Sequence, residues 1–260
     1  MNVFLLTDVE GIAGVDDIDF MDRTREKFKL ARDYLTDSIN LAVGACYDAG
    51  AEKVYYLDGH GGGGTVWPER VDGRAKKCTI GEWQELLRLG EIDCQIEIGC
   101  HARAGTIGGF LDHTLNSKQF FTVRVNGLEM SELSLHALLC SKYGVPVIAC
   151  VGDTAACRQA EEYVPGIFTG AVKHAERRNQ AVTREDADAI LTDTIRRALA
   201  DWKSVPLYTL PEPLTVEIVY YRTDFCEDAL SRSKSGAQRI DARTLRKTVD
   251  VLRRYEDLKI

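Results

Sequence analysis

Three apolar segments in the first hundred residues each lead into side chains that bind metal ions. These side chains are two acids and two histidines: Asp8, Glu10, His60 and His101. Asp8 and Glu10 are two residues apart, so on extended backbone both point to the same side. Two neighbouring carboxylates repel each other unless a positive charge lies between them. Oxygen and imidazole ligands together suit a divalent transition ion, with zinc the leading choice and manganese or iron as alternatives.

A site with several carboxylates can hold two such ions about 3.5 to 4 Å apart, with one carboxylate bridging them. Such a pair lowers the pKa of a bound water and stabilises a tetrahedral intermediate, so the predicted reaction class is hydrolysis. Each motif alone is a weak signal, because an Asp-x-Glu sequence after a strand is usually a solvated loop and a single histidine usually bonds to a carbonyl. The prediction depends on their coincidence at strand ends.

The elements that must position these side chains have the pattern of an α/β fold. Residues 2–6 predict a buried strand, residues 25–49 a helix that ends at Gly50, and residues 53–57 a second strand. This order is a βαβ unit, whose two strands are parallel and whose crossover is right-handed. Ligands of open parallel sheets bind beyond the carboxyl ends of the strands. We therefore expect the two acids and two histidines to face one place.

The remaining elements complete a mostly parallel central sheet with flanking helices in residues 1–165, and a smaller α+β part in residues 166–260. The boundary is soft, and a single domain is the alternative. The predicted strands cover residues 78–80, 94–98, 145–151, 167–172 and 214–221, with a hairpin at 120–130. The predicted helices cover residues 82–89, 131–143, 154–163, 183–202 and 242–258. Residues 102–118 are predicted to form a long loop, which is often functional in a compact domain.

Composition excludes several classes of partner. The chain has 260 residues, 45% of them hydrophobic, which is enough for a substantial core. A net charge of −7 argues against nucleic acid or an anionic membrane as a partner. No apolar run approaches the roughly 20 residues of a membrane span. The eight cysteines lack paired spacing and no signal peptide precedes the first strand, so we expect reduced thiols and a cytoplasmic location.

Five motifs occur in an order that resembles a known family: TDVEG at 7–11, DGHGG at 58–62, GCHARAGT at 99–106, His113, and SEL at 131–133. They resemble the D-aminopeptidases of the bacterial dipeptide-transport type, over about the first 175 residues and including GAVK at 170–173. Departures from the family pattern include Cys100 in place of an aromatic residue and Thr114 in place of serine. These departures leave the ligand types unchanged.

The resemblance implies a dinuclear zinc aminopeptidase. Its ligands would be Asp8, Glu10, His60, His101 and Glu132, with Asp8 as the bridge. The family's catalytic histidine corresponds to His113, whose role as base, nucleophile or oxyanion support stays open. The implied substrates are short peptides or amides with an N-terminal D-residue such as D-alanine, and the implied assembly is a homo-oligomer, a ring-shaped decamer.

Three further interpretations accompany this prediction. His136 lies four residues after Glu132 on the same helix face, and we interpret it as a core residue because the ligand set is already complete. The enzymatic alternative is a dinuclear hydrolase of another amide or of a phosphoester. The non-enzymatic alternative is a metal- or peptide-binding module without turnover.

Overall fold

The computed structural model describes all 260 residues, Met1–Ile260, and contains two sheets. The first sheet has seven strands in the order β3-β2-β1-β4-β7-β8-β9. Their bounds are β1 (Asn2–Thr7), β2 (Lys53–Asp58), β3 (Ala75–Lys77), β4 (Cys94–Cys100), β7 (Val147–Asp153), β8 (Phe168–Arg177) and β9 (Gln180–Thr183). All neighbours are parallel except β8 and β9. The predicted α/β class is confirmed.

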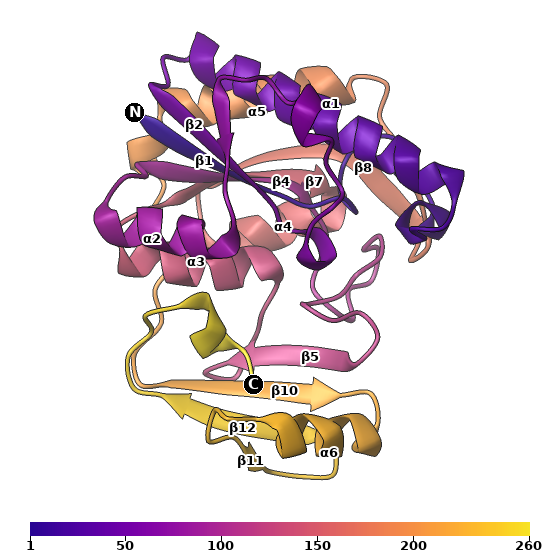
Figure 1. Cartoon of the computed structure of the whole chain (residues 1–260), viewed down its shortest axis with the longest axis vertical. Helices are drawn as coiled ribbons and strands as arrows, with labels where there is room; N and C mark the ends of the chain where they lie inside the picture. Colours follow the sequence, from indigo (N-terminus) through magenta and orange to yellow (C-terminus); the bar gives the residue numbers. More distant parts are fainter.

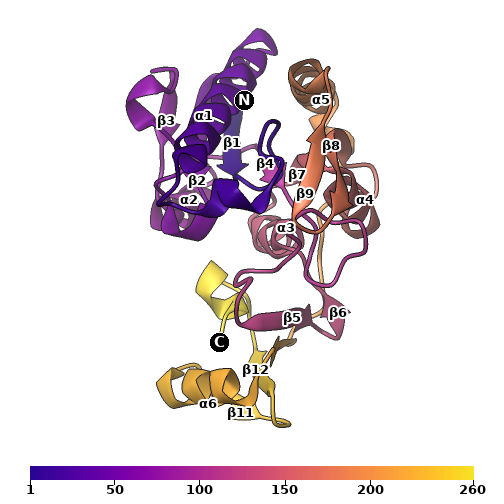
Figure 2. The ribbon, with the colours of Figure 1, turned by 90° about the vertical axis from the view of Figure 1, so that its right-hand side faces the viewer.

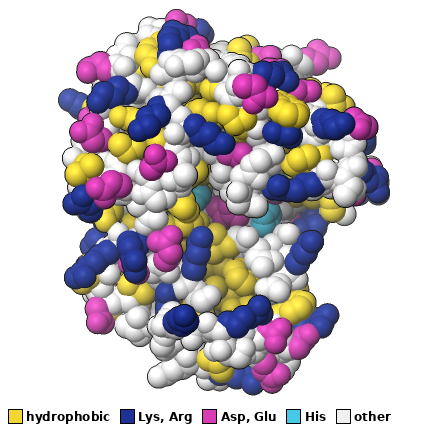
Figure 3. Space-filling view, viewed as in Figure 1, with side chains coloured by type: hydrophobic (Ala, Val, Ile, Leu, Met, Phe, Trp, Pro, Cys, Tyr) yellow, Lys and Arg dark blue, Asp and Glu magenta, His cyan; other side chains and the backbone are white.

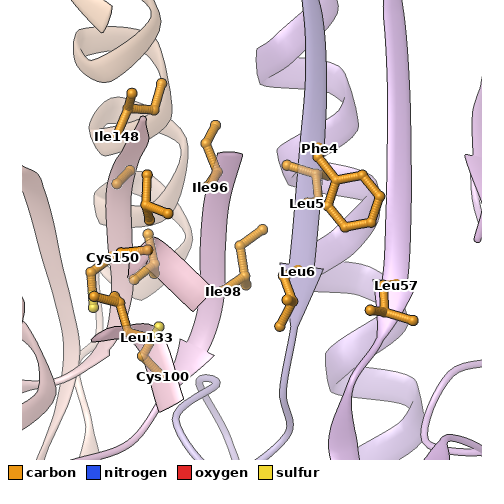
Figure 4. Close-up of a cluster of buried hydrophobic side chains, with 14 of the residues drawn as sticks. Phe4, Leu5, Leu6, Leu57, Ile96, Ile98, Cys100, Leu133, Ile148 and Cys150 are labelled. Carbon is orange, nitrogen blue, oxygen red and sulfur yellow. The ribbon is translucent and has the colours of Figure 1, made fainter. Parts of the chain in front are cut away.

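Helices cover both faces of this sheet, so its central strands are buried on both sides (Figure 1). On one face lie α1 (Glu26–Asp48) and α5 (Ala187–Ala200). On the other lie α2 (Ile80–Leu89), α3 (Glu132–Lys142) and α4 (Thr154–Tyr163). Apolar side chains from β1, β4 and β7 form the core between these layers (Figure 4). Continuous apolar strands are typical of parallel sheets buried on both faces.

The second sheet has five antiparallel strands in the order β11-β12-β10-β5-β6. Their bounds are β5 (Phe120–Val125), β6 (Leu128–Glu129), β10 (Leu214–Tyr220), β11 (Gln238–Arg239) and β12 (Thr244–Val249). This sheet lies below the first one, and α6 (Thr223–Arg232) covers its far face (Figures 1 and 2). Five short 3-10 helices complete the fold: η1 (Ile18–Met21), η2 (His60–Gly62), η3 (Pro68–Arg70), η4 (Trp202–Ser204) and η5 (Tyr255–Leu258).

The predicted final helix, residues 242–258, is wrong. The segment forms strand β12 and then η5, and helix α6 precedes it. In β12 the side chains alternate, and Leu245 is fully buried opposite Ile218 of β10. Pairing with β10 supplies a ladder of backbone hydrogen bonds, and the β-branched Thr244, Thr248 and Val249 favour the extended conformation. These contacts outweigh the helical spacing of the apolar residues.

Two other predicted elements are shifted. Thr183 ends β9 instead of capping α5, because β9 pairs with β8 and the helix starts four residues later. The third strand precedes the predicted 78–80, because Thr79 caps α2 through a reciprocal capping box with Glu82.

The predicted boundary near residue 165 stays a prediction about domains. The sheets exchange segments across it, since β8 and β9 join the first sheet while β5 and β6 join the second. All eight cysteines are buried and unpaired. None of the helices combines the length and the hydrophobicity of a membrane span.

Candidate active site

The loop after β1 crosses directly over the end of β4. The amide of Asp8 donates to the carbonyl of Ile98 at 2.8 Å, and the amide of Gly11 donates to Gly99 at 2.9 Å. A Cβ on Gly99 would lie 1.9 Å from the carbonyl oxygen of Asp8, and its φ is +83°. Only glycine permits this approach and this backbone conformation. The crossing places the acids of the first loop beside the histidine that follows β4.

The five side chains predicted as metal ligands converge beyond the carboxyl ends of β1, β2 and β4. His101 Nε2 lies 3.4 Å from Asp8 Oδ2 and 3.7 Å from Glu132 Oε1. His60 Nε2 lies 3.4 Å from Glu10 Oε1. These ligand atoms, together with that of His113, form three groups within 4.8 Å of one another, and Asp8, Glu10 and His101 each belong to two of them. Residues separated by more than 120 positions therefore share one site.

His113 lies beside this cluster. Its ring stacks on that of His101, with centroids 4.1 Å apart and planes 7° from parallel. Its Nε2 lies 3.7 Å from Glu132 Oε1 and 4.0 Å from Glu10 Oε1. Its Nδ1 donates to the carbonyl of Leu111 at 2.8 Å, which fixes the proton there and turns Nε2 toward the acids. His113 can therefore exchange a proton at Nε2 next to the cluster.

The donor atoms of the cluster fit divalent cations. Glu10 Oε2, His60 Nδ1 and His101 Nε2 are buried without a hydrogen-bond partner, which is costly and uncommon. His101 Nδ1 is 3.1 Å from the carbonyl of Ala102, so the ring, once it is neutral, would present the lone pair of Nε2 to the acids. Separations of 3.4 to 3.7 Å exceed hydrogen-bond length. They match the roughly 3.4 Å between two ligand atoms that share a tetrahedral zinc ion.

The pKa shifts of the cluster also indicate that its acids are stabilised by nearby positive charge. Burial alone would raise the pKa of Glu10, but the charges of His60, His101 and His113 hold that pKa well below its usual range. Burial lowers the pKa of His60, yet the carboxylate of Glu10 raises it to about 9. The pKa of His101 likewise lies well above its usual value, because the neighbouring acids outweigh its burial. Protons on these rings occupy the place that a cation would take.

Two devices hold the loops that carry the ligands. The glycines of residues 61–64 all have positive φ, so the chain after His60 folds back on itself. Asp58 closes this turn by accepting from the amide of Thr65 at 2.9 Å and from its hydroxyl. In α3, Ser131 caps the helix, and Glu132 accepts from the amide of Leu115 at 2.8 Å. Asp58, the last residue of β2, therefore stabilises the turn through its hydrogen bonds to Thr65.

Lys173, in the middle of β8, is fully buried beneath the loop of Glu10. Its Nζ donates to the carbonyl of Glu10 at 2.9 Å and to that of Val15. Burial lowers the pKa of Lys173 to about 7. The sequence motif at 170–173 contains this lysine but predicts no role for it. The sequence pattern that could have indicated a role for Lys173 is a charged residue at the end of an apolar run. The same pattern occurs just before His60, where the apolar run ends at Asp58.

A cavity of about 960 Å³ opens beside the cluster and reaches the second sheet. Histidine and acidic side chains are visible at the bottom of the hollow between the two halves of the molecule (Figure 3). His136, interpreted as a core residue, is buried and also lines this cavity. Its Nδ1 lies 3.2 Å from Glu97 Oε1, and its Nε2 forms a hydrogen bond of 3.1 Å with the hydroxyl of Tyr255. Tyr255 and Lys259 also line the cavity, and no sequence motif indicated them.

Comparisons with known proteins identify the family of the chain. A family model described as D-aminopeptidase matches residues 1–257. A D-aminopeptidase of Bacillus subtilis (strain 168) is 27% identical over 232 residues, which are 85% of this chain and 82% of that protein. A solved structure is described as the Zn-dependent D-aminopeptidase DppA from Bacillus subtilis, a self-compartmentalizing protease. It shares the fold with a TM-score of 0.90 at 22% identity, covering 99% of this chain and 95% of that one.

Proposed function

The chain belongs to the D-aminopeptidase family, and from this premise we propose that it is a zinc aminopeptidase that removes an N-terminal D-residue, such as D-alanine, from short peptides or amides. Membership confirms the resemblance carried by the sequence motifs. The observation that carries the proposal is the convergence of three acids and two histidines, three of which, Glu10, His60 and His101, have a buried donor atom without a partner.

We assign two zinc ions to Asp8, Glu10, His60, His101 and Glu132. Asp8 is the proposed bridge, because it is the residue shared by the group with Glu10 and His60 and the group with His101 and Glu132. The description of the Bacillus subtilis structure as Zn-dependent supports the choice of metal. Zinc in such a site acts as a Lewis acid and activates water for attack on an amide.

The residues of the chain supply positioning and proton transfer. Gly99 and Gly11 set the approach of the first loop, and Lys173 holds its backbone. His113 is the proposed catalytic histidine, because its Nε2 lies beside the cluster and its Nδ1 is fixed by the carbonyl of Leu111. At Nε2 it can take a proton during attack or return one to the departing amine.

We further propose that the protein assembles into a homo-oligomer, a ring-shaped decamer, in the cytoplasm. The Bacillus subtilis protein of the same fold is described as self-compartmentalizing, which supports an assembly. The eight unpaired cysteines suit a reducing compartment. Size-exclusion chromatography with light scattering tests this part, and a monomer at micromolar concentration would contradict it.

The test of the function is hydrolysis of D-alanyl-D-alanine, L-alanyl-L-alanine and a phosphodiester by purified protein, after chelation and after zinc is added back. We expect zinc-dependent release of D-alanine. Asp8→Asn should lose zinc and activity together, because it weakens the shared ligand. The matched control is Asp37→Asn, on the exposed side of α1, which should keep both. Turnover of the phosphodiester without turnover of either dipeptide would favour the alternative hydrolase.

A further inference from the structure

Lys259 stands on the wall of the cavity that contains the proposed zinc ligands. It follows η5, a segment fixed to the first sheet's helices by buried contacts. The hydroxyl of Tyr255 hydrogen-bonds with His136 at 3.1 Å, and its ring meets Trp83 edge-on at 5.9 Å. Leu258 is fully buried. The backbone that carries Lys259 is thus held in place relative to the site.

The ammonium of Lys259 has no carboxylate in direct contact with it. Its Nζ lies 4.2 Å from the centre of the Tyr255 ring and forms no ion pair within 4 Å. Burial lowers the pKa of Lys259, while the charges of Glu256 and Glu132 oppose that effect from a greater distance. A half-buried cation that contacts an aromatic ring but no carboxylate keeps part of its desolvation cost, and an anionic ligand would relieve that cost.

The charges of the cavity are arranged in two parts. The carboxylates of Asp8, Glu10 and Glu132 lie together at the proposed zinc site. Lys259 lies on the wall formed by η5, and the exposed Lys77 and Lys118 line the same cavity. A short peptide carries a scissile amide near its ammonium end and a carboxylate at its other end. With the proposed zinc ions bound, the three carboxylates are neutralised, so the complementarity lies between the carboxylate end of the peptide and the lysines of this wall.

We propose that Lys259 binds the free C-terminal carboxylate of the substrate, so that the site selects dipeptides and other very short peptides over uncharged amides. The inference rests on the proposed function, since it places the scissile amide at the zinc cluster. Phe120 and Ile218 of the second sheet line the same cavity and offer apolar contact for the side chain of the second residue. A charge-assisted hydrogen bond between ammonium and carboxylate supplies the selectivity.

The experiment compares D-alanyl-D-alanine with D-alanyl-D-alaninamide, in which a neutral carboxamide replaces the carboxylate. Zinc-loaded wild type, Lys259→Met and Lys259→Arg are assayed with both substrates. We expect Lys259→Met to lower kcat/KM for the dipeptide by about 10- to 100-fold, mainly through KM, because one charge-assisted contact is lost. Turnover of the amide should change by less than about 3-fold, and Lys259→Arg should restore part of the loss. Lys234→Met, an exposed lysine after α6, is the control and should behave as wild type.

Equal losses on both substrates would overturn the inference, because they would show that Lys259 only supports the structure. An unchanged KM for the dipeptide would overturn it as well. If zinc-loaded wild type hydrolyses neither substrate, the proposed function fails, and calorimetric binding of the same two ligands still decides on Lys259. Tighter binding of the acid than of the amide, abolished by Lys259→Met, supports carboxylate recognition. Equal binding of the two ligands to wild type refutes it.

Discussion

Replacing Lys173 with methionine separates a positioning role from a role in overall stability. At pH 7 the substitution changes the stability of the folded protein in two opposite ways: it removes the cost of burying an ammonium group, and it removes two hydrogen bonds. A pKa lowered from 10.5 to about 7 corresponds to about 5 kcal/mol against burying the ammonium, and methionine removes this cost. The carbonyls of Glu10 and Val15 lose their donor, at about 1 to 3 kcal/mol each. The two effects largely cancel, so we expect the free energy of unfolding to change by no more than about 3 kcal/mol.

The loop of Glu10, by contrast, loses the contact that holds its backbone. Residues that orient metal ligands typically contribute 10- to 100-fold to metal affinity or activity, and we expect a loss of that size in zinc affinity. Competition with a chromophoric chelator measures the affinity, and urea denaturation of the metal-free protein measures the stability.

The matched control for Lys173→Met is Lys247→Met. Lys247 is also buried and also donates to a backbone carbonyl, that of Glu256, but it lies in the second sheet. It should leave zinc affinity unchanged. Unchanged zinc affinity in Lys173→Met, together with a loss of more than about 4 kcal/mol in stability, would refute the positioning argument.

Three further predictions address the site. His113→Ala should lower kcat by at least about 100-fold, the usual range for a lost proton-transfer group, with two zinc ions still present by elemental analysis; turnover close to wild type would remove the catalytic assignment. Gly99→Ala should destabilise the protein by about 3 kcal/mol in thermal unfolding, because the added Cβ would clash with the carbonyl of Asp8. The control is Gly73→Ala, where a Cβ would have no atom within 4 Å, and it should change stability by only a fraction of that amount. Zinc binding at pH 7 should release about two protons, because His60, with a pKa of about 9, and His101, with a pKa well above its usual value, must both become neutral to bind. Zinc affinity should therefore rise with pH from 6 to 8, and calorimetry in buffers of different ionisation enthalpy that detects no proton release would contradict this.

The first half of the chain was predictable because its strands obey a general rule. Parallel strands present their carboxyl ends at one edge of the sheet, so the residues after them share a location whatever their separation in sequence. This rule is sufficient to predict that Asp8, Glu10, His60 and His101 lie together. Glu132 and His113 required the family resemblance, since an acid in a first helical turn and a histidine in a loop have common structural explanations.

The second half was harder because its register depends on long-range pairing. The spacing of the apolar residues after Ala242 fits a helix. Residues 244–249 form a strand instead because they pair with β10. The contact between Tyr255 and His136 joins residues 119 positions apart, and neither lies in a recognisable motif. A lysine near a surface segment is ordinarily solvated, so the sequence gives no reason to place Lys259 in the cavity. Its position there depends on how η5 packs against the helices of the first sheet.

The cavity wall formed by η5 emerges from the ribosome long after the ligand cluster. Glu132, the last of the five proposed ligands, precedes Tyr255 by more than 120 residues. The first sheet is complete at Thr183, so the growing polypeptide can form the ligand cluster and capture metal before the wall that receives peptides exists. Loading of the cofactor and acquisition of substrate selectivity would then be separate events in the life of each molecule.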